Sequence, residues 1–482
     1  MAMSDERRLQ DLAADPRPWW GLGEVVRLSV PTVLNTISYT IMQFVDGWMV
    51  SRVSKEALSA QFIGGISAFV TMCFFLGVVG CVNTFASQNL GAGRRERSAL
   101  YGWQGLWFGW AAAGGLAFLI LPAPRLLGLF GHEAEVTRLE TQYFRILIGG
   151  ALFTLSARAM GSFFIGIHRP SITLIAGVVA NIVNVIGNYV LIYGKFGFPA
   201  LGLAGAGIGT VMGSAVESAI LMTVFVAGAV AREFDVCSQW RIRWAAMMDL
   251  LRIGSPAGAM FLGDVLMWAI FMGRVIGGFG TADLAAAAIL NRYWHLCFMP
   301  VLGVSVAITA IVGRFCGAGQ PQRAWRRAHA GLLLVEAYMV TCGVVIWVAR
   351  EHLVGIFNEA ADPLVQSIAT RAMVFILLCQ AFDALSVVFI GALRGAGDTL
   401  WPGAVQLVLA WGLGLGGSAA VAKLWPEWGS FGPWAAVMVY IMLLGLGMWG
   451  RFLGGRWRRI KMVEPSAAPA PATEEPAALP PA

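Results

Sequence analysis

Charged residues are scarce in this chain of 482 residues. They make up 13% of the sequence, against about 25% in typical soluble domains, while 58% of the residues are hydrophobic. The mean hydropathy is +0.70. Between residues 27 and 453, no stretch has the polar composition of an independently folded soluble unit. A water-soluble core cannot bury so much apolar surface, so the composition predicts that the lipid bilayer surrounds most of the chain.

Sequence motifs for metal binding, disulfide bonding and ATP hydrolysis are also missing. The seven cysteines are scattered without a CxxC pair, and the five histidines show no HExxH spacing. There is no GxxxxGK[ST] phosphate-binding loop. The net charge of +7 comes from basic residues spread between apolar segments, whereas a nucleic-acid partner requires them on one surface. We therefore expect no catalytic residues, no cofactor and no nucleic-acid partner.

Twelve apolar segments are long enough to cross a bilayer. Its hydrocarbon core is about 30 Å thick, which a helix of roughly 20 residues spans. A transmembrane barrel would instead show short segments of alternating polarity. The sequence thus predicts an all-α integral membrane protein of twelve transmembrane helices. These cover residues 28–50, 58–87, 101–122, 141–163, 171–193, 203–230, 254–277, 284–313, 328–349, 364–392, 402–422 and 432–453.

Lysine and arginine residues distinguish the two sides of the membrane. Of these 34 residues, 22 fall in the termini and the loops on their side, and 7 fall in the opposite loops. Cytoplasmic loops carry the excess of positive residues, and an even number of spans puts both termini on one side. We therefore expect a multi-pass protein of the inner cell membrane with both termini in the cytoplasm.

Two pairs of segments repeat about halfway along the chain. RLSVPTVLNTISYTIMQFVDGWMV, from residue 27, resembles RIGSPAGAMFLGDVLMWAIFMGRV, from residue 252, with Pro31 and Pro256 in register. QNLGAGRRER and RFCGAGQPQR share a GAG triplet that starts at Gly91 and Gly317. The two repeats have offsets in residue number, 225 and 226, that agree within one position. The repeats run in the same order, which predicts two lobes related by an axis along the membrane normal.

This repeat divides the chain into five parts. We expect a cytoplasmic N-terminal segment (1–26), an N-lobe of six helices (27–230), an amphipathic cytoplasmic connector rich in Trp, Met and Arg (231–252) and a C-lobe of six helices (253–453). The C-terminal tail (454–482) starts with basic residues and continues into a Pro/Ala/Glu-rich sequence that is typical of disorder.

Several segments resemble those of the multidrug and toxic compound extrusion (MATE) transporters, most of all the NorM branch. The order and spacing of FVDGWMV in the first span, the two GAG loops, NVIGNYVLIYGKFGFPALGLAGAGIGT from residue 184, PAGAMFLGD from 256 and FDALSVVFIGALRGAGDT from 382 carry this resemblance. It covers residues 27 to 453. It implies two pseudo-symmetric six-helix lobes around a central cavity that opens alternately to the two sides. It also implies the exchange of substrate for Na⁺ or H⁺.

Three aspartates lie inside predicted spans: Asp46, Asp264 and Asp383. An ionisable group there costs about 2.5 to 3.5 kcal/mol on insertion scales, so it usually faces a cavity or a partner. Two carboxylates brought together would offer oxygen ligands to a cation. Alternatively, such a pair would hold a proton. Either event removes negative charge from the cavity.

The resemblance assigns roles to these aspartates. NorM-like members have a cation site formed by an acidic residue of span seven and an aspartate of span ten, which match Asp264 and Asp383, the candidate Na⁺ ligands. The family often has Glu at the first position, so Asp264 shortens the reach by one methylene. Asp46 matches the acidic residue implicated in coupling by the first lobe. Asn184 and Asn188 match a polar pair of span five near it. Some members have Asp at the second of these positions, and the asparagine here favours sodium coupling.

Each aspartate also has a purely structural interpretation. Asp383 could pair with Arg394, although 11 residues, about 16 Å along a helix, separate them. Asp264 could meet Arg274 through a neighbouring side chain. Asp46 could reach only the outer interface of the membrane. In these alternatives the carboxylates stabilise the fold and bind no ion.

Other polar residues inside the spans leave two interpretations open. Asn184 and Asn188 could form helix-to-helix hydrogen bonds or line the cavity. His295 is the natural proton carrier among the cavity candidates, but a lone helical histidine is more often a satisfied hydrogen-bonding group. Three arginines could line the cavity or form structural pairs: Arg158, Arg274 and Arg292.

These observations predict an antiporter that exports small cationic or amphipathic organic compounds, contacts membrane lipids and functions as a monomer. A flippase for lipid-linked sugars or other amphiphiles with the same two-lobe fold is the alternative. The intramembrane arginines favour the flippase, and the three carboxylates disfavour it. The sequence has neither the clustered His/Asp residues of a membrane-embedded enzyme nor the repeated filter motifs of a channel.

Overall fold

The computed structural model describes residues 21–357 and 362–463, and every regular element within these ranges is helical. The predicted disordered sequence from Glu464 onward and most of the predicted N-terminal segment lie outside the described residues. The helices of the first half are α2 (Gly21–Ser51), α3 (Lys55–Gly80), α4 (Val82–Gly91), α5 (Arg95–Ala117), α6 (Ala123–Gly128), α7 (Ala134–Gly149), α8 (Ala151–Gly166), α9 (Pro170–Tyr193) and α10 (Leu203–Val226). Those of the second half are α11 (Gly228–Glu233), α12 (Trp244–Ile270), α13 (Thr281–Gly317), α14 (Pro321–Val348), α15 (Arg350–Phe357), α16 (Pro363–Ala396), α17 (Leu400–Leu409), α18 (Ser418–Leu424) and α19 (Phe431–Leu453).

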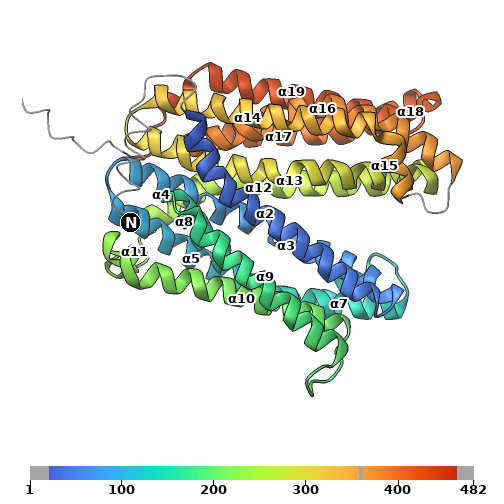
Figure 1. Cartoon of the computed structure of the whole chain (residues 1–482), viewed down its shortest axis with the longest axis horizontal. Coiled ribbons are helices and arrows are strands. Elements are labelled where there is room, and N and C mark those ends of the chain that lie inside the picture. The colour runs from blue at the N-terminus through green and yellow to red at the C-terminus, as the bar shows by residue number, and fades with distance from the viewer. Residues whose placement is uncertain (1–20, 358–361, 464–482) are drawn as a thin grey trace, which may run out of the picture.

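Twelve spans can be built from these helices. In Figure 1, α2, α3 and α9 are tilted relative to the helices of the second half. In the described residues, nine helical segments are long and apolar enough to cross a membrane by themselves, and the α7–α8 pair, bent by 48°, makes a tenth. The remaining two are α2 and α5, with 31 and 23 residues. With a rise of about 1.5 Å per residue, both helices are longer than the bilayer core is thick. Their charged ends and polar positions lower their hydropathy without shortening them.

Several helices extend beyond the apolar runs that predicted them. The first span begins at Gly21 instead of residue 28, and the eighth covers Thr281–Gly317 instead of 284–313. A helix does not end where its apolar stretch ends, because its backbone hydrogen bonds continue into polar turns at the membrane surface. Within the expected connector 231–252, the residues from Trp244 onward belong to α12.

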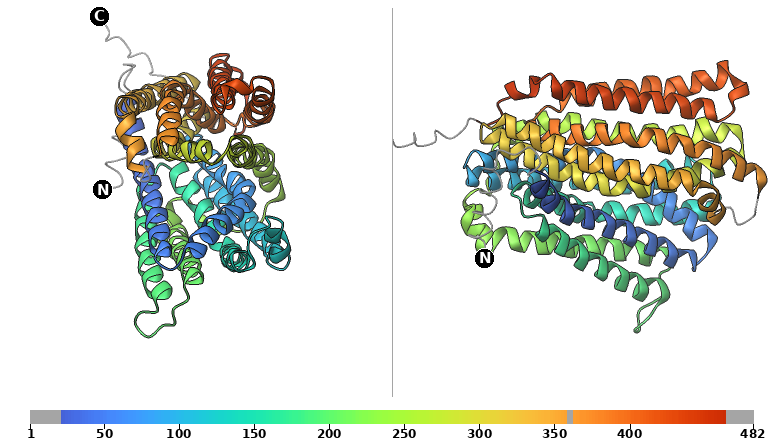
Figure 2. Two further views of the ribbon diagram at one scale, coloured as in Figure 1. Left: turned by 90° about the vertical axis from the view of Figure 1, so that its right-hand side faces the viewer. Right: turned by 45° about the horizontal axis from the view of Figure 1, so that its top comes forward.

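The helices form two lobes, α2–α10 and α12–α19, which lie side by side in Figure 1 as the blue-to-green and yellow-to-red halves. The end-on view in the left panel of Figure 2 separates the same two groups. The link between the lobes packs on α5. Trp103 Nε1 donates a hydrogen bond to Val236 O (2.9 Å), and Trp107 Nε1 donates one to Trp240 O (2.7 Å). Contacts between the lobes come mainly from α2, α3 and α4 against α12 and α13.

The contacts between the lobes follow the repeat found in the sequence. A Cβ atom at Gly91 would overlap the backbone carbonyl of Arg314, and a Cβ atom at Gly317 would overlap that of Gln88. The offset of the GAG loops separates Gly91 from Gly317, and the same offset separates Gln88 from Arg314. Each contact thus becomes the other when the halves are exchanged. Glycine is required at both positions because the two backbones touch.

A second pair of contacts exchanges in the same way. Thr84 Oγ1 donates to the carbonyl oxygen of Arg394 (3.0 Å), and His168 Nε2 donates to that of Ala310 (3.2 Å). Thr84 and Ala310 are separated by the GAG-loop offset, as are His168 and Arg394. The predicted pseudo-symmetry therefore extends to individual hydrogen bonds.

The lobes meet at one end of the bundle and not at the other. We call the end that holds Glu24, Gly91 and Gly317 the closed end, and the end that holds Ser51 and Thr281 the open end. Between described residues, no hydrogen bond, ion pair or ring contact joins the lobes beyond the middle of the bundle toward the open end. The contacts nearest that end are Gly77 against Gly258, Thr32 Oγ1 donating to Gly303 O (2.8 Å), and the rings of Phe69 and Phe261, with centroids 5.9 Å apart.

Candidate functional site

Two of the predicted carboxylates, Asp264 of α12 and Asp383 of α16, lie in one polar cluster of the C-lobe. Asp383, only 7% exposed, accepts a hydrogen bond at Oδ2 from Trp294 Nε1 (2.8 Å). Asp264 accepts at Oδ1 from Gln406 Nε2 (3.1 Å) and from the Tyr440 hydroxyl (3.4 Å). The charge of Asp264 acts on Asp383, and both act on Tyr440. The two aspartates therefore belong to the same electrostatic environment.

The C-lobe cluster is suited to a hard monovalent cation or a proton. Gln406 Oε1 is buried without a hydrogen-bond partner among the described residues, so a neutral oxygen is available beside the Asp264 carboxylate. In the described part of the chain, no three His, Cys, Asp or Glu residues come close enough to hold a metal ion. Carboxylate, amide and hydroxyl oxygens favour hard cations over transition metals. Asp264, Asp383 and Gln406 would hold the ion, and its binding would neutralise carboxylate charge.

The third aspartate, Asp46 of α2, forms a separate site in the N-lobe. It is 5% exposed, and Asn188 Nδ2 donates a hydrogen bond to its Oδ1 (2.6 Å). Asn188 Nδ2 also reaches Asn184 Oδ1 (3.5 Å), and Asn184 Nδ2 donates to Thr210 Oγ1 (3.4 Å). Asn188 Oδ1 is buried, and no described residue donates to it. The structure thus brings Asp46, Asn184 and Asn188 together, at a different place from Asp264 and Asp383.

An open apolar groove, with a volume of about 610 Å³, lies along α2 and α9 beside this N-lobe site. Its walls are mostly aliphatic, and they include Met42 and Val45, close to Asp46 on α2. The polar groups are Ser38 and Asn181, which are hydrogen-bonded to each other (2.6 Å).

His295 does not join either carboxylate site. It follows Trp294 on α13 but is exposed, and it forms no hydrogen bond with another described residue. Arg292 stacks its guanidinium on the Phe357 ring, 4.7 Å from the centroid. Arg274 is exposed and likewise forms no ion pair within residues 21–357 and 362–463. The alternative pairings of Asp264 with Arg274 and of Asp383 with Arg394 are not formed.

Sequence reasoning missed the residues that orient these carboxylates. Trp294, Gln406 and Tyr440 lie on three different helices, 89 to 176 residues from the aspartates they contact. No local spacing relates such positions. The one available signal was Gln406, an uncharged polar residue within an otherwise apolar span.

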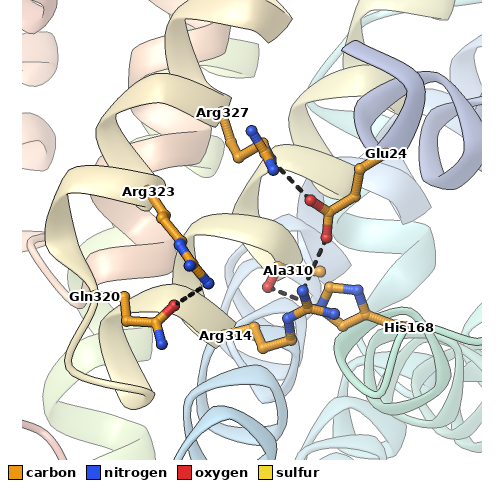
Figure 3. Close-up of polar contacts among 7 residues, drawn as sticks. All are labelled: Glu24, His168, Ala310, Arg314, Gln320, Arg323 and Arg327. Atoms are coloured by element: carbon orange, nitrogen blue, oxygen red, sulfur yellow. Dashed lines mark hydrogen bonds and ion pairs between the residues drawn. The ribbon is translucent and has the colours of Figure 1, made fainter. Parts of the chain in front are cut away.

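At the closed end, a buried ion cluster joins the lobes (Figure 3). Glu24, in the first turn of α2 and fully buried, accepts from Arg314 Nη2 (2.9 Å) and Arg327 Nε (2.8 Å). Both arginines belong to the C-lobe, on α13 and α14. His168, between α8 and α9, lies beside them. Burial, with a further effect of Arg314, holds the pKa of His168 well below its usual value, so the ring is neutral.

The sequence did not predict the Glu24 ion cluster, nor a second contact between the lobes on the other side of the closed end. Glu24 falls within the segment that we expected to be a polar N-terminal tail, but residues from Gly21 onward are helical and pack on the C-lobe. On the other flank of the closed end, the Tyr101 hydroxyl donates to Asp249 Oδ2 (3.2 Å), which again joins the two lobes.

Glu24→Gln is expected to weaken the closed end. It leaves Arg314 and Arg327 buried without their counter-charge, and removing one partner of a buried ion pair costs about 3 to 5 kcal/mol. Because the arginines belong to the other lobe, separating the lobes relieves this cost. The native reporter is Cys81, fully buried with its Sγ 3.9 Å from Ile253 O across the interface. In a chain that keeps Cys81 as its single cysteine, maleimide labelling should accelerate at least tenfold.

The matched control for this experiment is Glu135→Gln. Glu135 and Arg138 form an ion pair (2.6 Å) in which both side chains are exposed, and such pairs contribute little to stability. Labelling of Cys81 should stay at the wild-type rate in this variant. An unchanged rate in Glu24→Gln would show that the ion cluster does not hold the lobes together.

The MatE family profile matches residues 31–190 and 256–418, once in each lobe. The chain belongs to the MatE family. Among its relatives is a "Probable multidrug resistance protein NorM" of Xanthomonas axonopodis pv. citri, 28% identical over 459 residues, which are 93% of this chain and 97% of that one. The protein of the same name from Mesorhizobium japonicum is 28% identical over 397 residues, 80% of this chain and 84% of that one. The predicted resemblance is thus confirmed.

Solved MATE structures share the fold. A eukaryotic MATE transporter matches with a TM-score of 0.81 and 17% identity over 92% of this chain and 98% of its own. An outward-facing multidrug resistance MATE transporter of the MOP superfamily matches with a TM-score of 0.83 and 18% identity over 93% of this chain and 98% of its own. The predicted fold, twelve helices in two pseudo-symmetric lobes around a central cavity, is confirmed. This MatE chain is therefore a multi-span membrane protein.

Proposed function

We propose that this chain is a secondary antiporter, and not an enzyme, which exports small cationic or amphipathic organic compounds in exchange for Na⁺ or H⁺. The observation that carries the proposal is the pair of acidic sites, one in each lobe, whose carboxylates are bound by neutral donors and, among the described residues, by no arginine. A positive ion can therefore bind and neutralise them. The multidrug resistance proteins that this chain resembles support the same interpretation.

Alternating access follows from the uneven contact between the lobes. We infer that the structure corresponds to an outward-open state, because contacts between described residues join the lobes at the closed end and leave the open end apart. Access from the other side requires the glycine contacts and the Glu24 cluster to separate. The excess of Lys and Arg near the closed end supports assigning it to the cytoplasm, with both termini there, in the inner membrane.

The division into an N-lobe (27–230) and a C-lobe (253–453) fits this cycle as two bodies that rock against each other. Each chain contributes both lobes, so we propose that the monomer is the functional unit, surrounded by membrane lipid. The segment before Trp244 would keep the two bodies attached while they move.

The energy for export would come from the ion gradient. A ligand shifts a two-state equilibrium only through unequal affinity for the states, and tenfold coupling takes about 1.4 kcal/mol. Each positive charge that moves inward gains about 2.3 kcal/mol per 100 mV of membrane potential. One or two inward cations are sufficient without ATP. The asparagine at position 188, which cannot titrate, supports Na⁺ over a purely N-lobe proton mechanism.

The test is dye transport by the purified chain in proteoliposomes. Ethidium should accumulate when a Na⁺ gradient or a pH gradient is imposed separately, and accumulation should stop when that gradient is collapsed. The gradient that drives the dye identifies the coupling ion. No accumulation under either gradient would rule out the proposed antiport. A flippase would instead move a fluorescent lipid between leaflets without any effect of either gradient.

A further inference from the structure

Two arginines of the membrane-spanning helices near the closed end, Arg158 and Arg394, form no ion pair with another described residue. Arg158, on α8, is exposed although it lies between helices, with its guanidinium beside Gly80 of α3: a Cβ atom at Gly80 would be 3.8 Å from Arg158 Nη2. It forms no hydrogen bond or ion pair with another described residue. Arg394, on α16, has a buried Nε without a partner there. Neither side chain has a role in the acidic sites or in the closed-end ion cluster.

The two arginines come from different lobes, and both lie beside residues 80–84 of the N-lobe. Thr84, one turn beyond Gly80, donates a hydrogen bond to the carbonyl oxygen of Arg394 (3.0 Å). The positive charge of Arg394 acts on Arg158. Both α8 and α16 run from the open end to the closed end, and helical side chains tilt toward the start of their helix. Both guanidinium groups therefore reach from the closed end toward the cavity.

The neighbouring carboxylates leave this pair with an excess of positive charge. Glu217 of α10 acts on Arg158 but forms no hydrogen bond with it. Asp398 lies beside Arg394, but its Oδ2 already accepts from Arg451 Nε (2.8 Å). The two guanidinium groups therefore have one remaining carboxylate near them, Glu217, which forms no hydrogen bond with Arg158. The Nε of Arg394 is buried without a partner, and the guanidinium of Arg158 is exposed, so an incoming anion would gain charge-assisted hydrogen bonds there.

We propose that Arg158 and Arg394 form an anion site at the base of the central cavity, which binds the carboxylate of zwitterionic organic substrates. Guanidinium groups bind carboxylates through two parallel hydrogen bonds, which fixes orientation as well as charge. The cationic group of the same molecule can then reach toward the acidic sites nearer the open end. This inference rests on the proposed export function and extends its cationic substrates to compounds that carry both charges.

The site also has a place in the transport cycle. Because Arg158 and Arg394 belong to different lobes, separation of the lobes at the closed end moves the two guanidinium groups apart. A carboxylate that is bound by both arginines in the outward-open state would be bound by one in the inward-open state. The affinity for the carboxylate group would therefore differ between the two states, which couples its binding to the conformational change.

The test compares a fluorescent zwitterionic fluoroquinolone with its ethyl ester, which carries only the positive charge. Transport into proteoliposomes is measured for the wild type, Arg158→Gln, Arg394→Gln and Arg158→Lys. The glutamine variants should reduce transport of the acid at least tenfold relative to the ester, and the lysine variant should retain part of it. The control is Arg145→Gln on α7, where Arg145 Nε bonds only to Ile120 O (2.9 Å); its acid-to-ester ratio should equal that of the wild type.

Two outcomes would overturn the anion site. Equal loss of acid and ester transport in the glutamine variants would assign the arginines a structural role, and unchanged ratios would remove them from the substrate site. Direct titration of the purified variants with both compounds, followed by tryptophan fluorescence, separates binding from turnover. Failure of the export function itself would appear differently, as loss of ethidium transport in the wild type.

Discussion

Asp383→Asn should abolish ion-coupled transport while the protein still inserts and folds. The asparagine Oδ1 can accept the Trp294 hydrogen bond, which is 2.8 Å long in the wild type, so the local packing remains. The negative charge that attracts the cation is lost. Ethidium accumulation in proteoliposomes, under the gradient that drives the wild type, should fall to the level of empty vesicles. Asp264→Asn should have the same direction of effect, because the two aspartates share one electrostatic environment.

The matched control for the aspartate variants is Asp283→Asn. Asp283 lies in the first turn of α13, in the same lobe, and contacts neither acidic site. Its charge at a helix N-terminus contributes about 0.3 to 1 kcal/mol, so transport should stay close to the wild-type level. Wild-type accumulation in Asp383→Asn, with the gradient present, would remove Asp383 from the ion site.

A single methyl group at Gly91 or Gly317 should prevent the two lobes from meeting at the closed end. A Cβ atom at either position overlaps the backbone of the opposite lobe, which cannot move aside as a flexible side chain would. Neither glycine has a positive φ angle, so alanine fits the local helix. The closed end can then no longer close. We expect Gly91→Ala and Gly317→Ala to reduce transport at least tenfold and to accelerate maleimide labelling of Cys81.

Gly114→Ala is the control for the two glycine variants. Gly114 also lies within a helix, α5, but a Cβ atom there meets nothing within 4 Å. Alanine is the better helix former by about 1 kcal/mol, so this variant should be as active as the wild type and slightly more stable. Normal transport by Gly91→Ala would mean that the lobes do not need this close approach.

The fold could be predicted from the sequence because its two determinants are local. The length of each apolar run sets the number of spans, and the repeat sets the relation between the halves. The offset between the GAG loops reappears in the contacts of Gly91 with Arg314 and of Gln88 with Gly317. The helix ends do not follow from the apolar runs alone: α12 starts at Trp244, because its amphipathic first turns continue the helix.

The candidate sites could be predicted only in part. Carboxylates in apolar spans are conspicuous because they are costly there, so Asp46, Asp264 and Asp383 could be identified. The partners of Asp264 and Asp383 are harder to identify: Trp294 and Tyr440 carry no such signal, and Gln406 is only an uncharged polar residue in an apolar span. Their ion-binding role remains a prediction. Nothing in the sequence indicated the π-helical segments Phe271–Ile276 and Ala410–Gly417, which follow the Asp264 and Gln406 regions. Such wide turns arise from tertiary contacts and commonly occur near functional sites.

The closed-end cluster was missed for a different reason. Glu24 looks like an ordinary surface residue of a charged N-terminal segment, and its two arginine partners are 290 and 303 residues away. A charge near the end of a span is normally solvated. Only the tertiary structure shows that the first turn of α2 packs against Arg327 of the other lobe.

The Tyr101–Asp249 contact takes on a further meaning when the two flanks of the closed end are compared. Asp249 is the repeat counterpart of Glu24, and Tyr101 that of Arg327, at the same spacing that relates the two halves elsewhere. One flank is fastened by a carboxylate between two guanidinium groups, and the other by a single phenol hydrogen bond of 3.2 Å. The two related flanks therefore differ in strength, with an ion cluster on the Glu24 side and a single neutral-donor hydrogen bond on the Tyr101 side. The contacts at the closed end should separate first at Tyr101, and the Glu24 side should act as the pivot.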